Sequence, residues 1–107
     1  MRYKGWEIWL AQVVYEDKPL VQKRPVLVVP TGQVLLVAKM TKTEPRNKYE
    51  HKIVYWKESG LLMATTIRTE KLLKMPEKDM LHKLGDLHPV DIAEFEKKLI
   101  LLRSKNQ

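Results

Sequence analysis

The chain has 107 residues, which suffices for one hydrophobic core and not for two, so we expect a single domain over residues 1–107. Twenty Lys and Arg stand against thirteen Asp and Glu, and this net charge of +7 favours nucleic acid, an acidic protein or an anionic membrane surface as partner. The absence of cysteine excludes a disulfide framework and a thiolate metal site. No run reaches the ~18 apolar residues of a membrane span, and the start lacks the apolar segment of a signal peptide. We therefore expect a cytoplasmic protein with no membrane segment.

Most of the first two thirds of the chain is typical of β-strands. Runs rich in aliphatic and aromatic β-formers predict strands at 6–15, 24–29, 34–40, 52–56 and 61–69. The tight connection "PTGQ" (30–33) predicts that the second and third strands form a hairpin. We expect turns at "EDKPL" (16–20) and "KESG" (57–60), the latter a helical turn closed by Gly60, and a long polar loop at 41–51.

The last third predicts helices. Segment 76–85 begins with Pro76, carries acidic residues in its first turn and stops at Gly85, which are helix start and stop signals. Segment 89–102 opens with a proline, and its apolar residues recur at helical spacing, at Ile92, Phe95, Leu99 and Leu102. The predicted fold class is mainly β with C-terminal helices: a small, strongly curved sheet or barrel of about five to seven short strands with two to three α-helices.

Several kinds of chemistry have no motif in this sequence. No glycine-rich phosphate loop or Ser/His/Asp arrangement occurs, and His51, His82 and His88 do not follow a metal-ligand spacing. The plainer interpretation makes His82 a cation at a helix C-terminus and His88 an N-cap or loop residue. We expect no metal and no cofactor, so an enzyme with this sequence would act without either.

The ends of the predicted strands carry the candidate site. Arg24 begins the second strand and Thr41 ends the third, so the hairpin should place them at the same end. Arg68 closes the last strand and could reach the same rim. Guanidinium groups match phosphate oxygens and stabilise the extra charge of a phosphoryl transition state. RNA supplies its own nucleophile, the 2′-hydroxyl, and Thr41 is suited to position it rather than to act as a base.

Further basic residues near this rim are candidates for RNA binding. We expect this role for six residues: Lys23, Lys39, Lys42, Arg46, Lys48 and His51. A plainer interpretation stays open for each group, because strand-end charges and polar loops are often simply solvated and a strand-end threonine is often a turn hydroxyl. Trp6, Trp9 and Trp56 fit core or dimer contacts better than base-stacking platforms.

The same segments resemble a known family. "KRPVLVV" (23–29), "VLLVAKMT" (34–41), "YWKESGLLMATTIRTEKLLKM" (55–75) and "LHKLGDLHPVDIAEFEKKL" (81–99) resemble, in order, the MazF/PemK toxins of type II toxin–antitoxin systems. The opening "YKGWEIWLAQVVY" resembles the first strand of these toxins. The match spans nearly the whole chain.

This resemblance implies a fold, an activity and partners. The family fold is a small SH3-like β-barrel with appended helices, usually a homodimer. Its typical members are metal-independent endoribonucleases that cut single-stranded RNA at short sequences, leave a 2′,3′-cyclic phosphate and are neutralised by an acidic antitoxin. The family's catalytic positions correspond to Arg24, Thr41 and Arg68 of this sequence.

The sequence also departs from the family. Its first loop, "EDKPLVQK" (16–23), is short and lacks glycine, and "PTGQ" replaces a longer polar loop. Three hypotheses therefore stay open: an endoribonuclease toxin, a non-catalytic module that binds RNA, DNA or a peptide, and a structural or phage-associated homodimer that uses the fold as a scaffold.

Overall fold

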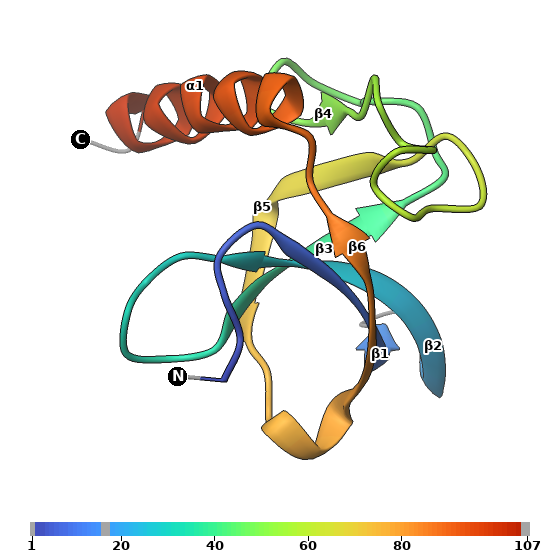
Figure 1. Ribbon diagram of the computed structural model, residues 1–107. Helices are drawn as coiled ribbons and strands as arrows, with labels where there is room; N and C mark the ends of the chain where they lie inside the picture. The colour runs from blue at the N-terminus through green and yellow to red at the C-terminus, as the bar shows by residue number, and fades with distance from the viewer. Residues whose placement is uncertain (1, 16–17, 106–107) are drawn as a thin grey trace.

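The computed structural model describes residues 2–15 and 18–105, and over these residues the chain forms an antiparallel sheet with one α-helix (Figure 1). A three-residue 3-10 turn, η1 (Glu77–Asp79), precedes the last strand, and the α-helix, α1 (Pro89–Lys105), ends the chain. The six strands of the described part are β1 (Glu7–Tyr15), β2 (Lys18–Val29), β3 (Leu36–Thr41), β4 (His51–Lys52), β5 (Thr66–Lys74) and β6 (Met80–Asp86).

The strands lie in the order β4-β5-β3-β2-β1-β6, and every neighbouring pair is antiparallel. The long β2 pairs with β1 over most of its length and with β3 only over its last four residues, so the sheet bends along this strand. Within the described residues no pairing joins the edge strands β4 and β6, so the expected barrel is present as a curved sheet without observed closure. The turn before β5 approaches β6 instead: a Cβ on Gly85 would lie 2.2 Å from the Ser59 carbonyl oxygen.

Two apolar clusters occupy the two faces of this sheet. The helix face is the side covered by α1, where Ile8, Leu27, Met40 and Ile67 pack with Phe95 of the helix. The pocket face is the opposite side, and its core residues include Ala11, Val13, Val26, Val28, Val37, Met75 and Met80. Because side chains alternate along a strand, odd and even residues of one strand serve different faces.

The predicted helix over 76–85 is wrong. Only η1 is helical there, and Met80–Asp86 forms β6, with Ile8 opposite Gly85 and Leu10 opposite His82. The start signals at Pro76 do begin a turn, but the edge of β1 offers backbone hydrogen bonds that outweigh local helix preference. The described part thus has one α-helix, not two to three, and His82 is an exposed strand residue.

Other expectations were met with shifted boundaries. The 24–29/34–40 hairpin is confirmed, with Val26 opposite Lys39, and the helix predicted at 89–102 is α1. The strand predicted at 52–56 is reduced to β4, because residues 53–65 form a turn at 56–60 with irregular chain on either side, and the strand predicted at 61–69 starts only at Thr66. The 57–60 turn is confirmed and ends at Gly60, whose φ is 86°. The turn expected at 16–20 lies partly outside the described residues, and β2 has begun by Lys18.

The tryptophans contribute to the interior. Trp6 and Trp56 pack against the helix-face cluster, and Trp6 meets the Phe95 ring edge-on with centroids 5.9 Å apart. Trp9 packs on the pocket-face cluster and donates its indole N–H to Glu7 at 3.0 Å. These contacts confirm the core interpretation of all three rings.

Candidate functional site

The hairpin brings Arg24 and Thr41 to the same end of the sheet, as the sequence predicted. Val26 opposite Lys39 is the last pair of this hairpin, and Arg24 and Thr41 each lie two residues beyond it, at the same end of the two strands. On its other side, Arg24 pairs with Ala11 of β1. Side-chain alternation puts Arg24 on the face of Val26, which is the pocket face.

Arg68 joins this group from the neighbouring strand. Thr41 pairs with Thr66, and Ile67 belongs to the helix-face cluster, so Arg68 belongs to the pocket face. The β3–β5 register is irregular here, because Ala38 lies opposite Leu72 whereas Met40 lies opposite Ile67. Residues 68–71 of β5 therefore lie between these two pairs, where β3 has only Lys39. Irregularities of this kind often change the direction of side chains beside functional sites.

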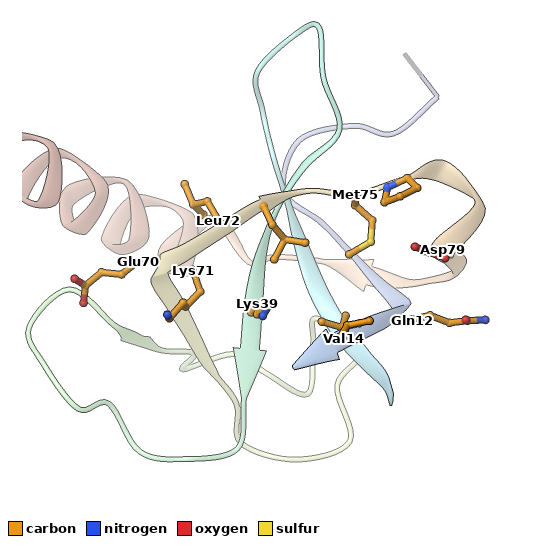
Figure 2. A pocket seen from close by; sticks show the side chains of 11 residues that line it. Gln12, Val14, Lys39, Glu70, Lys71, Leu72, Met75 and Asp79 are labelled. Atoms are coloured by element: carbon orange, nitrogen blue, oxygen red, sulfur yellow. The ribbon is translucent and has the colours of Figure 1, made fainter. Parts of the chain in front are cut away.

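Lys39 lines a cavity of about 490 Å³ on this face. Its side chain is 7% exposed and is held by interactions within the protein. Figure 2 shows Lys39 between Lys71 of β5 and Val14 of β1, with Gln12 and Asp79 farther along the rim. The lining of this cavity combines apolar side chains with two lysines, Lys39 and Lys71, and two carboxylates, Glu70 and Asp79.

The loop at 41–50 is folded against the sheet by polar contacts. The Thr41 hydroxyl accepts a hydrogen bond from the Thr43 backbone N–H at 3.2 Å, and Asn47 donates to Glu70 at 2.9 Å. Lys52 Nζ lies 2.6 Å from a carboxylate oxygen of Glu44. The loop therefore presents its exposed cations from a defined backbone.

The carboxylate of Glu50 holds two arginines of the predicted site. One oxygen accepts the Arg46 backbone N–H at 3.0 Å, and the other lies 3.3 Å from Arg46 Nη2 and 3.8 Å from Arg68 Nε. Glu50 has 5% of its side chain exposed and Arg68 has 22%. Sequence reasoning missed Glu50, because nothing local to "KYEHK" shows that it meets a residue of β5.

Two residues predicted to bind RNA lie elsewhere. Lys23 precedes Arg24 by one residue, so alternation directs it to the side of Leu27 rather than to the pocket face. His51 is 3% exposed on the helix face, where both of its ring nitrogens are engaged by α1. The remaining predicted cations, Lys42, Arg46 and Lys48, are exposed on the loop.

The contacts of His51 form a buried polar network. His51 Nε2 donates to Asp91 at 2.8 Å, and Lys98 Nζ donates to His51 Nδ1 at 2.9 Å, which fits a neutral imidazole. Asp91 is fully buried and also accepts the backbone N–H groups of Val54 and Tyr55 at 2.9 and 3.0 Å. The network fastens the first turn of α1 to the segment after β4.

The pKa values in this network follow from burial and hydrogen bonding. Burial lowers the pKa of His51 below 6.5; the hydrogen bond to Asp91 opposes this effect, and the nearby Lys98 charge adds to it. Burial alone would raise the pKa of Asp91, but hydrogen bonds from Val54, Tyr55 and His51 outweigh it and hold the pKa below 3.8. At neutral pH the pair is therefore a neutral imidazole beside a carboxylate.

The predicted position of His88 at the start of a helix is confirmed. It directly precedes α1, its Nδ1 accepts the Val90 backbone N–H at 3.1 Å, and its ring stacks on Tyr55 with centroids 3.9 Å apart. Across residues 2–15 and 18–105, no group of three or more His, Asp or Glu side chains is arranged to hold a metal ion. In the same residues, no helix has the length and apolar character needed to cross a membrane.

A family model described as "PemK-like, MazF-like toxin of type II toxin-antitoxin system" matches residues 4–102. Because this match covers most of the sequence, the chain belongs to that toxin family. No curated protein sequence matches the chain.

Solved structures share the fold. A mycobacterial endoribonuclease in complex with its cognate antitoxin superposes with a TM-score of 0.77 at 9% identity, covering 95% of each chain. A second mycobacterial endoribonuclease gives 0.75 at 8% identity, covering 97% of this chain and 93% of the other. The Mycobacterium tuberculosis toxin MazF-mt6 gives 0.69 at 20% identity, covering 87% of this chain and 91% of the other. At these identities the likeness concerns the fold, and the activity must be argued from the site.

Proposed function

We propose that this toxin is an endoribonuclease that cleaves single-stranded RNA on its pocket face and that a cognate antitoxin inhibits it. The feature that supports this proposal is the position of Arg24, Thr41 and Arg68 along their strands, which by side-chain alternation assigns all three to the pocket face, where Lys39 lines a cavity. Family membership and the endoribonuclease relatives of the same fold support it.

The proposed reaction uses the substrate's own nucleophile. The 2′-oxygen of one ribose attacks the adjacent phosphorus and loses its proton, while the bond from phosphorus to the 5′-oxygen breaks and that oxygen takes up a proton. The products are a 2′,3′-cyclic phosphate and a 5′-hydroxyl end. The charge that builds on the non-bridging oxygens needs fixed donors, which are the guanidinium groups of Arg24 and Arg68. Thr41 orients the phosphate or the 2′-hydroxyl.

The other cations bind the rest of the RNA strand. Lys42, Arg46 and Lys48 extend from the folded loop and would contact backbone phosphates, whereas Lys39 would meet the group that enters the cavity. The net charge of +7 attracts an acidic antitoxin by the same field. The homodimer implied by the resemblance remains a prediction.

The proposal is tested by incubating the purified, antitoxin-free protein with a long single-stranded RNA in EDTA and mapping the ends. We expect discrete fragments with cyclic phosphate ends. A second RNA with a single 2′-deoxynucleotide at a mapped site should bind equally and resist cleavage there. Intact RNA in the presence of folded protein would refute the nuclease and favour the non-catalytic binding module.

A further inference from the structure

Glu50 lies beside Arg68, where its carboxylate can orient the guanidinium group. In the β4–β5 pair, His51 is opposite Ile67 and Lys52 is opposite Thr66, so the same register sets Glu50 opposite Arg68. Since His51 and Ile67 both belong to the helix face, Glu50 and Arg68 both belong to the pocket face. The register of the sheet therefore brings the side chains of Glu50 and Arg68 next to each other.

The carboxylate of Glu50 is buried, and a buried carboxylate needs charged or hydrogen-bonding partners. Its described partners are Arg46, through the backbone N–H and Nη2, and Arg68, through Nε. The Arg46 side chain is half exposed and belongs to a loop, whereas the Arg68 side chain is mostly buried and belongs to strand β5. The Glu50 carboxylate thus contacts both Arg46 of the loop and Arg68 of the sheet.

The Nε atom of Arg68 is the part of the guanidinium that lies nearest to Glu50 among the contacts described. This atom is buried and has no hydrogen-bond partner among residues 2–15 and 18–105, which is rare for a buried polar atom. Glu50 Oε2 lies 3.8 Å away, and an approach of less than about 1 Å would bring it within normal hydrogen-bond distance. Hydrogen bonds in unliganded sites are often long and shorten when the substrate binds.

We propose that Glu50 is a positioning residue for the reaction, which holds Arg68 by its Nε edge so that the rest of the guanidinium engages the scissile phosphate. This inference rests on the proposed function. A guanidinium has five donors in a rigid fork, so a carboxylate on one edge fixes the direction of the others. Fixing the side chain in advance removes rotamer freedom that phosphate binding would otherwise have to restrict.

The backbone that carries Glu50 is itself anchored from the other face. Its neighbour His51 contacts Asp91 and Lys98 of α1, and Asp91 also accepts the Val54 and Tyr55 N–H groups. Glu50, directly before β4, and His51, the first residue of β4, therefore connect the proposed site to the helix. A positioning group gains accuracy from such a rigid support.

The test compares Glu50→Gln with Glu44→Gln in RNA cleavage at saturating RNA. Both variants remove one negative charge from the same loop region, but Glu44 is exposed and pairs with Lys52, away from Arg68. We expect Glu50→Gln to lower kcat about tenfold or more, with the Kd for a non-cleavable 2′-deoxy RNA unchanged or lower. Glu44→Gln should keep the wild-type kcat.

A double-mutant cycle shows whether Glu50 acts through Arg68. In an Arg68→Lys background, which keeps the charge and lacks Nε, adding Glu50→Gln should have no further effect on kcat. Full additivity would overturn the proposal. So would a rise in kcat in Glu50→Gln, since it would mean that the carboxylate competes with RNA for the arginines.

A measurement without activity separates this inference from the proposed function. In the NMR spectrum of 15N-labelled protein, Arg68 Nε–H should give a slowly exchanging signal in the wild type and in Glu44→Gln and should lose protection in Glu50→Gln. If the wild type fails to cleave RNA, the nuclease proposal fails, and this signal alone decides whether Glu50 positions Arg68. An equally protected signal in Glu50→Gln would refute the positioning role. If Glu50→Gln does not fold, Arg68→Lys replaces it in the test and should show the same loss of kcat. A wild-type kcat in Arg68→Lys would refute the positioning role of Glu50.

Discussion

The helix face and the pocket face of one sheet hold their polar groups in different ways. On the helix face, Asp91 is fully buried and accepts three hydrogen bonds, from His51 and from the backbone N–H groups of Val54 and Tyr55. On the pocket face, Glu50 shares one carboxylate between two arginines, and Arg24 and the loop cations reach solvent. The first arrangement is fully satisfied and favours stability, whereas the second keeps charge available for a ligand.

The difference between the two faces separates residues that are adjacent in the sequence. Lys23 and Arg24 are adjacent in β2, and Glu50 and His51 are adjacent at the start of β4, yet alternation sends the members of each pair to opposite faces. Charge alone therefore does not define this site. Under the proposed function, the position of a cation along its strand decides whether it faces the RNA.

The largest expected effect is on the helix face. Phe95→Ala removes a fully buried ring that packs on Trp6, and we expect the free energy of unfolding to fall by about 3–5 kcal/mol. Leu101→Ala, on the same helix but half exposed, should change it by about 0.5 kcal/mol or less. Urea unfolding followed by tryptophan fluorescence checks both, and equal losses would contradict the assignment of the helix face.

The buried imidazole predicts that stability depends on pH. Because the pKa of His51 is lowered from 6.5 in the folded chain, the unfolded chain binds a proton first as the pH falls below 6.5. The stabilisation is complete above that pH and declines below it, with a slope of at most about 1.4 kcal/mol per pH unit.

Urea unfolding between pH 7.5 and pH 5 measures this slope. We expect the wild type to lose stability as the pH falls through that range. His51→Gln should remove most of the slope, whereas the exposed His82→Gln should leave it unchanged. A slope that persists in His51→Gln would show that another group titrates.

The smallest effect concerns one loop cation on the side that meets RNA. Lys42→Ala should reduce the salt dependence of binding to a 2′-deoxy strand by about 0.7 in the slope of log K against log[salt]. Lys97→Ala in α1, which removes an exposed charge on the helix that covers the opposite face, should leave the slope at its wild-type value. The same slope in all three proteins would show that Lys42 touches no phosphate.

Local sequence signals predicted the elements that depend on local physics. The β2–β3 hairpin follows from two apolar runs around a Pro/Gly turn, and α1 follows from Pro89 and helical spacing. The failure at 76–85 has a tertiary cause, because the free edge of β1 recruits Met80–Asp86 as a strand. The reasoning that put Arg24 and Thr41 at the same end of the hairpin needs only the order of two adjacent strands, and the hairpin itself is confirmed.

The remaining parts of the site depend on contacts between residues far apart in sequence. His51 reads as a loop cation in "KYEHK", but it is buried because Asp91 and Lys98, forty or more residues later, surround it. The pairing of Glu50 with Arg68 likewise requires the β4–β5 register, and β4 is only two residues long. No local pattern in the sequence encodes either contact.

The central claim is that the pocket face carries the chemistry, and the pair Lys23 and Arg24 tests it most directly. Single-turnover cleavage of one RNA by Arg24→Ala and by Lys23→Ala compares the loss of one positive charge at adjacent positions on opposite faces. We expect Arg24→Ala to cleave at least about 100-fold more slowly, and Lys23→Ala to cleave at about the wild-type rate. Equal losses in the two variants, or full activity of Arg24→Ala, would contradict the account.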